Sequence, residues 1–383
     1  MGLKVLMIGV YPMEPGVVNG GVESATSTLV PALAERDDVD SVTVLRFHHG
    51  DAPTRYRRES SKVEIHYVRA QYRFRMLTGS VLDLRKARKL VAQLEPDVVH
   101  GQEMEVDGDI ATRCSSNSVV TVHGITYVEC QLYGGPGVRR QLRARLIRNL
   151  AERVLQRAKV VVSISGYDAD EVAGLVRGRM VSIPNPTAAE FFALAPSGPT
   201  APRLLCAGVL TPRKNQLGLV NAFAQIVKAV PSARLELVGA QPDAAYARLV
   251  RERVGALGLT DCVHIVDQVD NARMRHEIAI ARAVVLFSRQ ETAPTIIAQA
   301  MAAGKPVVAS RVGGVAEMVE DGATGFVVES EDEAKLVDRL LTVLQDQDLC
   351  LRMGGRGHDV AEARFSPDKV AELTVDAYRK AMS

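Results

Sequence analysis

Short runs of apolar residues alternate with longer amphipathic stretches along the whole chain. Val42 to Phe47 and Val119 to Val122 show the first pattern, whereas Val81 to Leu94 has the apolar spacing that is typical of a helix. Continuous apolar runs indicate strands that are buried on both faces, as in parallel sheets covered by helices. The pattern therefore predicts an α/β fold.

The alternation is interrupted once, over residues 183–203, where five prolines favour a linker: Pro184, Pro186, Pro196, Pro199 and Pro202. Strands are expected on both sides of this segment, at residues 3–10, 42–47, 63–68, 98–100, 119–122 and 160–164, then at 204–207, 235–238, 263–266, 284–287, 307–309 and 326–328.

The length of 383 residues fits two domains. We expect a doubly wound, Rossmann-like domain at 1–186, a second at 203–365, and a C-terminal helix at 366–383 that crosses back to the first domain. Doubly wound sheets bind ligands at the carboxyl ends of their strands, so two such domains are expected to face each other across a ligand-binding cleft.

Composition narrows the function classes. The net charge is +2, with 24% charged and 47% hydrophobic residues, so no strong field favours nucleic acid as a partner. Five widely spaced cysteines indicate neither a disulfide framework nor a thiolate zinc site. With no apolar run long enough to span a membrane, we expect a cytoplasmic protein.

The most informative segment begins where a strand ends at Phe287. Glu291 follows at the carboxyl end of that strand, and Pro294 is placed at the start of a helix that runs to Met301. The first amides of this helix, those of Thr295 and Ile296, are suited to an anion such as a diphosphate. Gln299 lies eight residues after Glu291, about two helical turns away.

A second candidate is the pair Arg213 and Lys214, which follows Gly208 and precedes a predicted helix. Two cations at a helix amino end oppose the helix dipole and are stabilised by an external anion. A lysine suits a point contact with phosphate, and an arginine offers a planar fork. A solvated helix start is the alternative interpretation.

These segments, taken together, resemble the retaining GT-B glycosyltransferases of glycosyltransferase family 4. The resemblance covers nearly the whole chain and rests on motifs in the family's order: Gly20-Gly21-Val22-Glu23, Thr121-Val122-His123-Gly124, Val162-Ser163-Ile164-Ser165, Ile183-Pro184-Asn185-Pro186, Ala207-Gly208-Val209-Leu210-Thr211-Pro212-Arg213-Lys214-Asn215, Ser288 to Val328, and Phe365-Ser366-Pro367. It implies the GT-B architecture, with acceptor binding in the first domain and donor binding in the second.

The resemblance also implies roles for single residues. Those implied to be catalytic are His123, Arg213, Lys214 and Glu291, with His123 facing the donor sugar and Lys214 binding the diphosphate. Those implied to bind the nucleotide sugar are Gly20, Gly21, Gly208, Thr295, Ile296 and Gln299. A plain helix-entry turn explains Gly20 and Gly21 nearly as well.

Three positions depart from the family pattern. Val209 stands where the family commonly has an arginine, and Pro294 stands where it usually has a glycine, which removes one amide donor from the anion site. Gln299 replaces the second glutamate of the family's E-x7-E motif, the carboxylate that holds the ribose hydroxyls. The resemblance therefore implies a phosphate site with fewer donors than is usual in the family, and weaker binding of the ribose.

The function implied is the retaining transfer of a sugar from a nucleotide-diphosphate donor, most readily a UDP-sugar, to a hydroxyl acceptor. Neither a cofactor nor a metal is expected, although Asp107 and Asp109 imitate the Asp-x-Asp metal site of another glycosyltransferase class. The acceptor is left open between a small molecule, a glycan and a lipid-linked molecule. Two alternatives stay open: a sugar-nucleotide epimerase, and a nucleotide-sugar-binding protein without turnover.

An arginine-rich amphipathic stretch over residues 139–157 is relevant to where the protein is located in the cell. Such a helix could lie on anionic lipid, giving peripheral contact with the inner face of the membrane, or it could be a solvated helix face.

Overall fold

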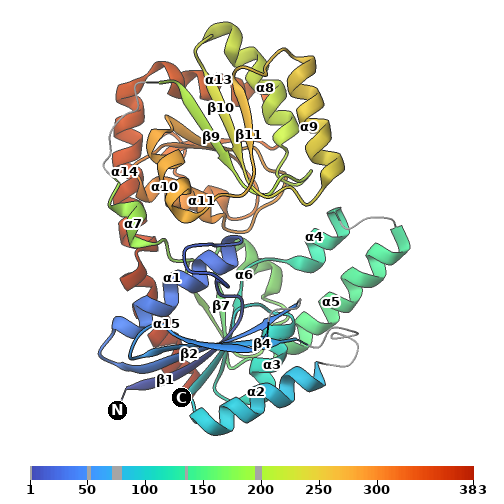
Figure 1. Ribbon diagram of the computed structural model, residues 1–383, viewed down its shortest axis with the longest axis vertical. Helices are drawn as coiled ribbons and strands as arrows, with labels where there is room; N and C mark the ends of the chain where they lie inside the picture. Colours follow the sequence, from blue (N-terminus) through green and yellow to red (C-terminus); the bar gives the residue numbers. More distant parts are fainter. Residues whose placement is uncertain (1, 50–52, 71–79, 134–136, 195–200) are drawn as a thin grey trace. The chain divides into compact units, whose positions relative to one another are not determined.

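The structure is a computed structural model that describes residues 2–49, 53–70, 80–133, 137–194 and 201–383. The chain divides into two compact units. Unit 1 comprises residues 1–12, 21–186 and 367–383, and unit 2 comprises residues 13–20 and 187–366. Each unit contains a parallel sheet with helices on both faces, so the predicted α/β fold is confirmed (Figure 1).

Unit 1 is built on an eight-stranded sheet in the order β3-β4-β2-β1-β5-β6-β7-β8, parallel except at the β3–β4 edge. Its elements are β1 (Leu3–Ile8), α1 (Gly21–Glu35), β2 (Val39–His48), β3 (Arg55–Arg58), β4 (Val63–Arg69), α2 (Val81–Leu94), β5 (Val98–Gly101), α3 (Val106–Cys114), β6 (Ser118–Val122), α4 (Thr126–Tyr133), α5 (Gly137–Arg157), β7 (Val160–Ser163), α6 (Gly166–Val172), β8 (Arg179–Ser182) and α15 (Pro367–Met382).

Unit 2 is built on a six-stranded parallel sheet in the order β11-β10-β9-β12-β13-β14. Its elements are α7 (Ala189–Phe192), β9 (Arg203–Ala207), α8 (Gln216–Ala229), β10 (Arg234–Val238), α9 (Ala244–Ala256), β11 (Val263–Val266), α10 (Asn271–Ile280), β12 (Ala283–Leu286), α11 (Thr295–Ala302), β13 (Val307–Ser310), α12 (Val315–Met318), β14 (Gly325–Val328), α13 (Glu333–Gln345) and α14 (Gln347–Phe365).

All twelve predicted strands are present, but the sequence pattern missed two strands of unit 1. Both lie at sheet edges: β3 reads Arg-Tyr-Arg-Arg and β8 reads Arg-Met-Val-Ser, and their side chains are largely exposed. An edge strand faces solvent and needs no continuous apolar run. The segment after β6 contains a helix, Thr126–Tyr133, that the sequence analysis did not predict.

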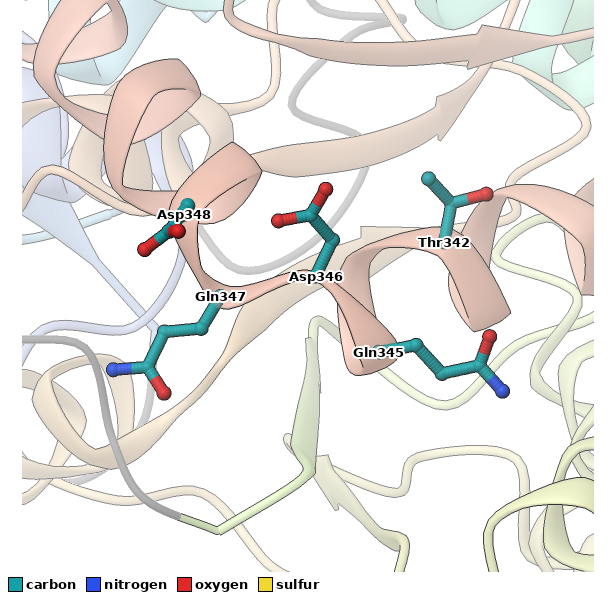
Figure 2. A pocket seen from close by; sticks show the side chains of 5 residues that line it. All are labelled: Thr342, Gln345, Asp346, Gln347 and Asp348. Atoms are coloured by element: carbon teal, nitrogen blue, oxygen red, sulfur yellow. The ribbon is translucent and has the colours of Figure 1, made fainter.

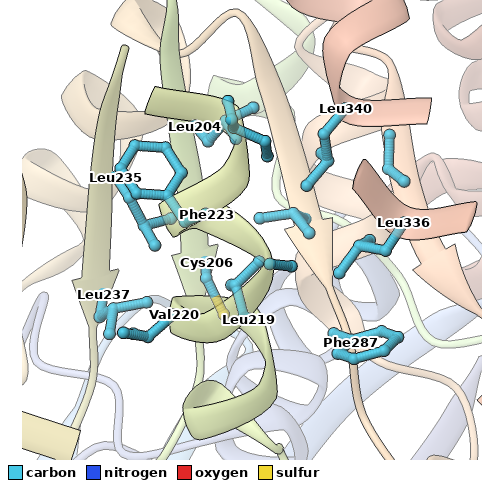
Figure 3. Close-up of a cluster of buried hydrophobic side chains, with 14 of the residues drawn as sticks. Leu204, Cys206, Leu219, Val220, Phe223, Leu235, Leu237, Phe287, Leu336 and Leu340 are labelled. Atoms are coloured by element: carbon cyan, nitrogen blue, oxygen red, sulfur yellow. The ribbon is translucent and has the colours of Figure 1, made fainter. Parts of the chain in front are cut away.

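The core of unit 2 shows why the apolar runs predicted strands reliably. Side chains that alternate along β9 and β10 pack beneath α8, where Phe223 lies among Leu204, Cys206 and Leu235 (Figure 3). These side chains are at most 3% exposed. The opposite face of the same sheet packs on α11 and α14. Because helices cover both faces, most residues of these strands are apolar regardless of the side to which they point, although Glu236 of β10 is a buried exception.

Residues 13–20 differ from the expected division at 1–186, since they group with unit 2. The side chain of Gln268 donates hydrogen bonds to the Val18 carbonyl at 3.0 Å and to Oδ1 of Asn19 at 2.7 Å. The Asn271 amide lies 3.4 Å from the carbonyl oxygen of Gly16.

Two adjacent glycines of α14 provide a test of the packing. A Cβ added at Gly354 would lie 1.9 Å from the carbonyl oxygen of Gly304, which follows α11, whereas one added at Gly355 would meet nothing within 4 Å. Gly354→Ala is therefore expected to lower the free energy of unfolding by about 1 to 3 kcal/mol, the usual cost of overpacking. Gly355→Ala should raise it by up to about 1 kcal/mol through helix propensity. Urea unfolding of both variants checks this, and equal effects would contradict the close approach of α11 and α14.

Candidate active site

Unit 2 places a lysine and a glutamate in contact where two neighbouring strands end. Lys214 follows β9 and Glu291 follows β12, and Nζ of Lys214 lies 2.6 Å from Oε1 of Glu291. Both side chains are largely buried, with exposed fractions of 11% and 5%. Nη1 of Arg213 lies 3.7 Å from the other carboxylate oxygen. The structure thus brings together three of the predicted catalytic residues, although Lys214 and Glu291 are 77 positions apart in the chain.

The loop that carries Lys214 is shaped by its backbone. Gly208 has a φ of +155° and accommodates the side chain of Lys214, whose Cε would lie 3.4 Å from an added Cβ. Asn215 adopts the left-handed conformation and caps α8 by accepting a hydrogen bond from the Gly218 amide at 3.3 Å. The loop therefore holds the ammonium group beside Gly208 at the start of α8.

Helix α11 begins beside this cluster, three residues after Thr292. Pro294 is its N-cap residue and Thr295 its first helical residue, so the amides of Thr295 and Ile296 are among those that a helix leaves without intrahelical acceptors. Gln299 lies one turn further on and is half-buried. These predicted binding residues thus share one helix whose amino end lies at the carboxyl edge of the sheet.

One of the three departures from the family pattern, Val209, lies in the same region. Val209 is 38% exposed and places an apolar side chain where an arginine is common. Arg213 already has protein partners. It donates a hydrogen bond to the Gln290 carbonyl at 3.3 Å, and it also contacts Glu291. Lys214 is the more buried of the two cations and lies closer to Glu291.

In unit 1, His123 lies at the carboxyl end of β6 and is joined to a buried polar network. Its Nε2 lies 2.8 Å from Oε1 of Gln102, which follows the neighbouring strand β5. His100 continues the network, with Nε2 at 2.7 Å from Oγ1 of Thr121 and Nδ1 at 2.9 Å from the hydroxyl of Tyr378 on α15. A cavity of about 20 Å³, the room of roughly one water, adjoins these side chains.

The network determines the protonation state of His123. Burial lowers its pKa to about 4, an effect that Asn185 opposes in part. The ring is therefore neutral near pH 7, and since an amide oxygen can only accept, Nε2 carries the proton that is donated to Gln102. Nδ1 is buried without a well-formed hydrogen bond to any described residue, and it is left as an acceptor.

Sequence reasoning missed Gln102 and Tyr378. Gln102 occupies its place because Gly9 has no side chain: a Cβ on Gly9 would lie 2.6 Å from Cβ of Gln102. A polar residue immediately after a buried strand is a signal that could have found Gln102. Tyr378 lies 278 residues from His100, and no local pattern links the two.

Gly20 and Gly21 lie where helix α1 begins. Gly20 has a φ of +108°, which favours glycine, and an added Cβ would meet nothing within 4 Å. Gly21 is the first residue of α1. Glu23, in the first turn, is 2% exposed and forms an ion pair with Arg46 of β2, so it is a structural partner rather than a free base.

The carboxylates that imitate a metal site have other roles. Asp109 lies within α3 and forms ion pairs with Arg113 at 2.9 Å and Arg157 at 2.5 Å. Within the described ranges, no group of three or more histidine, cysteine, aspartate or glutamate side chains is arranged to hold a metal ion.

A surface hollow of about 610 Å³ lies where α13 meets α14, away from the predicted site residues (Figure 2). It is lined by five polar side chains: Thr342, Gln345, Asp346, Gln347 and Asp348. Asp346 accepts a hydrogen bond from the Leu349 amide at 2.8 Å and so caps α14. The polarity of this hollow is thus explained in part by a helix junction.

Two protein families match the chain, one in each half. The family described as Glycosyltransferase Family 4 matches residues 19–191, and the family described as Glycosyl transferases group 1 matches residues 190–360. The two matches meet between β8, the last strand of the unit 1 sheet, and β9, the first strand of the unit 2 sheet. Together they run from residue 19 to residue 360.

Similar proteins of known name cover part of the chain. N-acetyl-alpha-D-glucosaminyl L-malate synthase of Bacillus anthracis is 31% identical over 152 residues, 40% of this chain and 38% of the relative. The GDP-mannose-dependent alpha-(1-6)-phosphatidylinositol monomannoside mannosyltransferase of Mycobacterium tuberculosis is 30% identical over 185 residues, 46% of this chain and 47% of the relative. The matched stretches thus cover less than half of each relative.

Solved structures match the whole fold. Sucrose-phosphate synthase of Thermosynechococcus elongatus superposes with a TM-score of 0.82 at 22% identity, covering 98% of both chains. HepE of Anabaena, in complex with UDP-glucose, has a TM-score of 0.73 at 19% identity and covers 98% of both chains. These likenesses show the fold.

The fold and the two family matches define the class of this protein, which has the GT-B architecture. The chain belongs to the GT-B glycosyltransferases of the family 4 type. The family resemblance inferred from the motifs is thus confirmed. Among the helices of the described residues, none is long and apolar enough to cross a membrane.

The tautomer of His123 can be checked directly. We expect a neutral ring with the proton on Nε2 from about pH 5 to pH 9, because its pKa lies near 4 and Gln102 accepts that proton. Gln102→Glu should raise the pKa of His123, since a carboxylate stabilises the imidazolium. Nitrogen-15 NMR of histidine-labelled protein measures both. Titration of wild-type His123 near pH 6.5, or a proton on Nδ1, would contradict the network.

Proposed function

We propose that this protein transfers a sugar from a nucleotide-diphosphate donor to a hydroxyl acceptor, with retention at the anomeric carbon and without a metal. The observation that carries the proposal is the buried contact between Lys214 and Glu291 at the carboxyl ends of β9 and β12, beside the amino end of α11. Three features of this arrangement suit a diphosphate: an ammonium group, a neighbouring guanidinium and a helix amino end.

Charge explains how this cluster assists the reaction. During transfer, the bond between the anomeric carbon and the donor phosphate oxygen breaks while the acceptor oxygen bonds to that carbon, and negative charge grows on the leaving diphosphate. Lys214 and the first amides of α11 stabilise that charge. In a retaining reaction of this type, the departing phosphate oxygen receives the proton of the acceptor hydroxyl.

Glu291 and His123 are assigned to the sugar. Glu291 holds the ammonium of Lys214 in place, and its carboxylate can also accept a hydrogen bond from a sugar hydroxyl. His123, neutral with an unprotonated Nδ1, offers a second acceptor. Gly20, Gly21 and Gly208 allow close approach of ligand to backbone.

The cationic cluster takes the role that a divalent ion has in other transferases. Asp109 is bound by two arginines, so the Asp-x-Asp imitation does not offer two available carboxylates. Incubation with labelled nucleotide sugars in the presence of EDTA tests the proposal: transfer or slow donor hydrolysis supports it. Donor isomerisation, or binding without turnover, would replace it with an epimerase or a binding protein.

A UDP-sugar is the donor that we propose, on the family resemblance and on the UDP-glucose complex of HepE. The mycobacterial relative is GDP-mannose-dependent by name, so a panel of UDP, GDP and ADP sugars decides the base. A rise in melting temperature on addition of the donor provides the measurement.

We also propose a cytoplasmic protein that contacts membranes peripherally through α5. The amino-terminal half of α5 exposes Val138, Leu142 and Leu146, with exposed fractions of 83%, 59% and 41%, among arginines. Exposed apolar side chains flanked by cations suit the boundary of an anionic membrane.

Lys214→Ala tests the diphosphate assignment. We expect turnover to fall about 100-fold or more, as with other single-donor deletions. Because the substitution leaves the buried Glu291 carboxylate without its nearest cation, melting temperature is measured alongside, and Lys214→Ala/Glu291→Gln should recover any lost stability. Lys228→Ala, an exposed lysine of α8, is the matched control. Near-native turnover in Lys214→Ala would show the assignment to be wrong.

Gln299→Glu tests the ribose assignment. A carboxylate accepts two charge-assisted hydrogen bonds, whereas an amide offers one neutral oxygen. The variant should bind UDP about tenfold more tightly, the equivalent of 1.4 kcal/mol, and prefer UDP to dTDP more strongly than the wild type does. Titration calorimetry with both nucleotides measures this. If UDP binding is unchanged or weaker, Gln299 does not face the ribose.

A further inference from the structure

One face of the unit 1 sheet carries a row of cationic side chains at the ends of three adjacent strands. Arg46 of β2 pairs with Tyr67 of β4, which pairs with Arg55 of β3. Two residues further on, His48 pairs with Arg69. Because alternate residues of a strand, and partners on neighbouring strands, point to the same side, all five side chains lie on one face. We call these five residues the β2–β4 cationic face.

Contacts identify which side of the sheet this is. Leu45, Phe47 and Val68, which alternate with the cationic residues, pack in the core formed with α2. On the other side, Arg46 forms its ion pair with Glu23 of α1. The hydroxyl of Tyr67 donates to the Pro12 carbonyl at 2.7 Å, just after β1. The β2–β4 cationic face therefore lies on the α1 side at the carboxyl edge, where doubly wound sheets bind ligands.

Positive charge is concentrated around the ring of Tyr67. The guanidinium carbons of Arg55 and Arg57 lie 4.7 Å and 5.2 Å from the ring centroid. Stacking on an aromatic ring stabilises a guanidinium modestly, but several guanidiniums held close together repel one another. Glu59 pairs with Arg57 at 2.6 Å and Glu23 pairs with Arg46, and a bound anion would add to the charge compensation that these two carboxylates provide.

His48 is the second observation that points to a ligand. It is 5% exposed, yet neither of its ring nitrogens has a hydrogen-bond partner among the residues that the structure describes. A buried donor that is left unsatisfied destabilises the folded state. Burial lowers the pKa of His48, and the neighbouring Arg46 and Arg55 lower it further. A ring N–H in such positive surroundings is best satisfied by a negatively charged acceptor.

The geometry points to a binding site for a phosphate group on the β2–β4 cationic face, carried by the acceptor that unit 1 binds. Arg55 and Arg69 would supply planar forks for the phosphate oxygens, and His48 a buried N–H donor. The assignment of this phosphate to the acceptor rests on the proposed transferase function. The phosphate site itself does not, because binding can be observed without turnover.

Inorganic phosphate is the probe for this site. The full chain is labelled at histidine, the His48 signals are assigned by their loss in His48→Gln, and sodium phosphate is titrated at constant ionic strength against sodium chloride. We expect a saturable shift of the His48 signals. The half-saturating concentration should rise about fivefold or more in Arg55→Gln and in Arg69→Gln, whose side chains are exposed and whose loss is tolerable for folding.

Two matched controls locate the effect. Arg85→Gln removes an exposed arginine of α2, which packs on the opposite face of the sheet, and should leave the titration unchanged. Lys214→Ala should also leave it unchanged, which separates this site from the donor diphosphate site of unit 2. An absent shift, an equal shift with chloride alone, or undiminished binding in both Arg55→Gln and Arg69→Gln would overturn the proposal.

Two further arms distinguish the source of the phosphate. Glycerol 1-phosphate that displaces inorganic phosphate indicates a soluble acceptor. Co-sedimentation with phosphatidic acid vesicles that weakens in Arg55→Gln and Arg69→Gln indicates a lipid headgroup. If neither ester binds in a manner that depends on these arginines, a phosphate-bearing acceptor is excluded. Failure of sugar transfer with intact phosphate binding would instead count against the transferase function.

Discussion

The parallel arrangement of the strands is the constraint on which the rest of this structure depends. In a parallel sheet every strand ends at the same edge, so the residues that follow neighbouring strands converge there whatever their separation in the chain. Lys214 and Glu291 meet because β9 and β12 are neighbours, and His123 meets Gln102 because β6 lies beside β5. The chemistry of each unit is therefore concentrated along one edge of its sheet.

At these edges, buried polar groups contact partners that use only part of the hydrogen-bonding capacity of each group. Lys214 contacts Glu291 through Nζ, and an ammonium has three donors, so it can bind a phosphate oxygen while keeping its carboxylate. His123 donates through Nε2 and keeps Nδ1 as an acceptor. Partners of this kind orient a functional group in advance, which reduces the reorganisation needed when charge develops.

Prediction from the sequence succeeded where a residue's environment follows from its neighbours in the chain. The central strands are continuous apolar runs because helices cover both faces, and all twelve predicted strands are present. Prediction failed at β3 and β8, since an exposed edge strand needs no continuous apolar run, and the helix α4 was not predicted. The motifs led to Lys214, Glu291 and His123, but not to Gln102, which belongs to none of them although it directly follows the buried strand β5.

The sequence by itself determined the α/β class, the two sets of strands, the family and the residue types that can bind a diphosphate. These features depend on local patterns: apolar runs, glycine and proline positions, and charges beside a helix start. The tertiary structure alone decided which polar and charged side chains contact one another. It paired Lys214 with Glu291, Glu23 with Arg46, and His100 with Tyr378, and it aligned Arg46, Tyr67 and Arg55 across three strands. Strand order and register set these contacts, and neither can be read from a single segment, because each depends on where the rest of the chain packs.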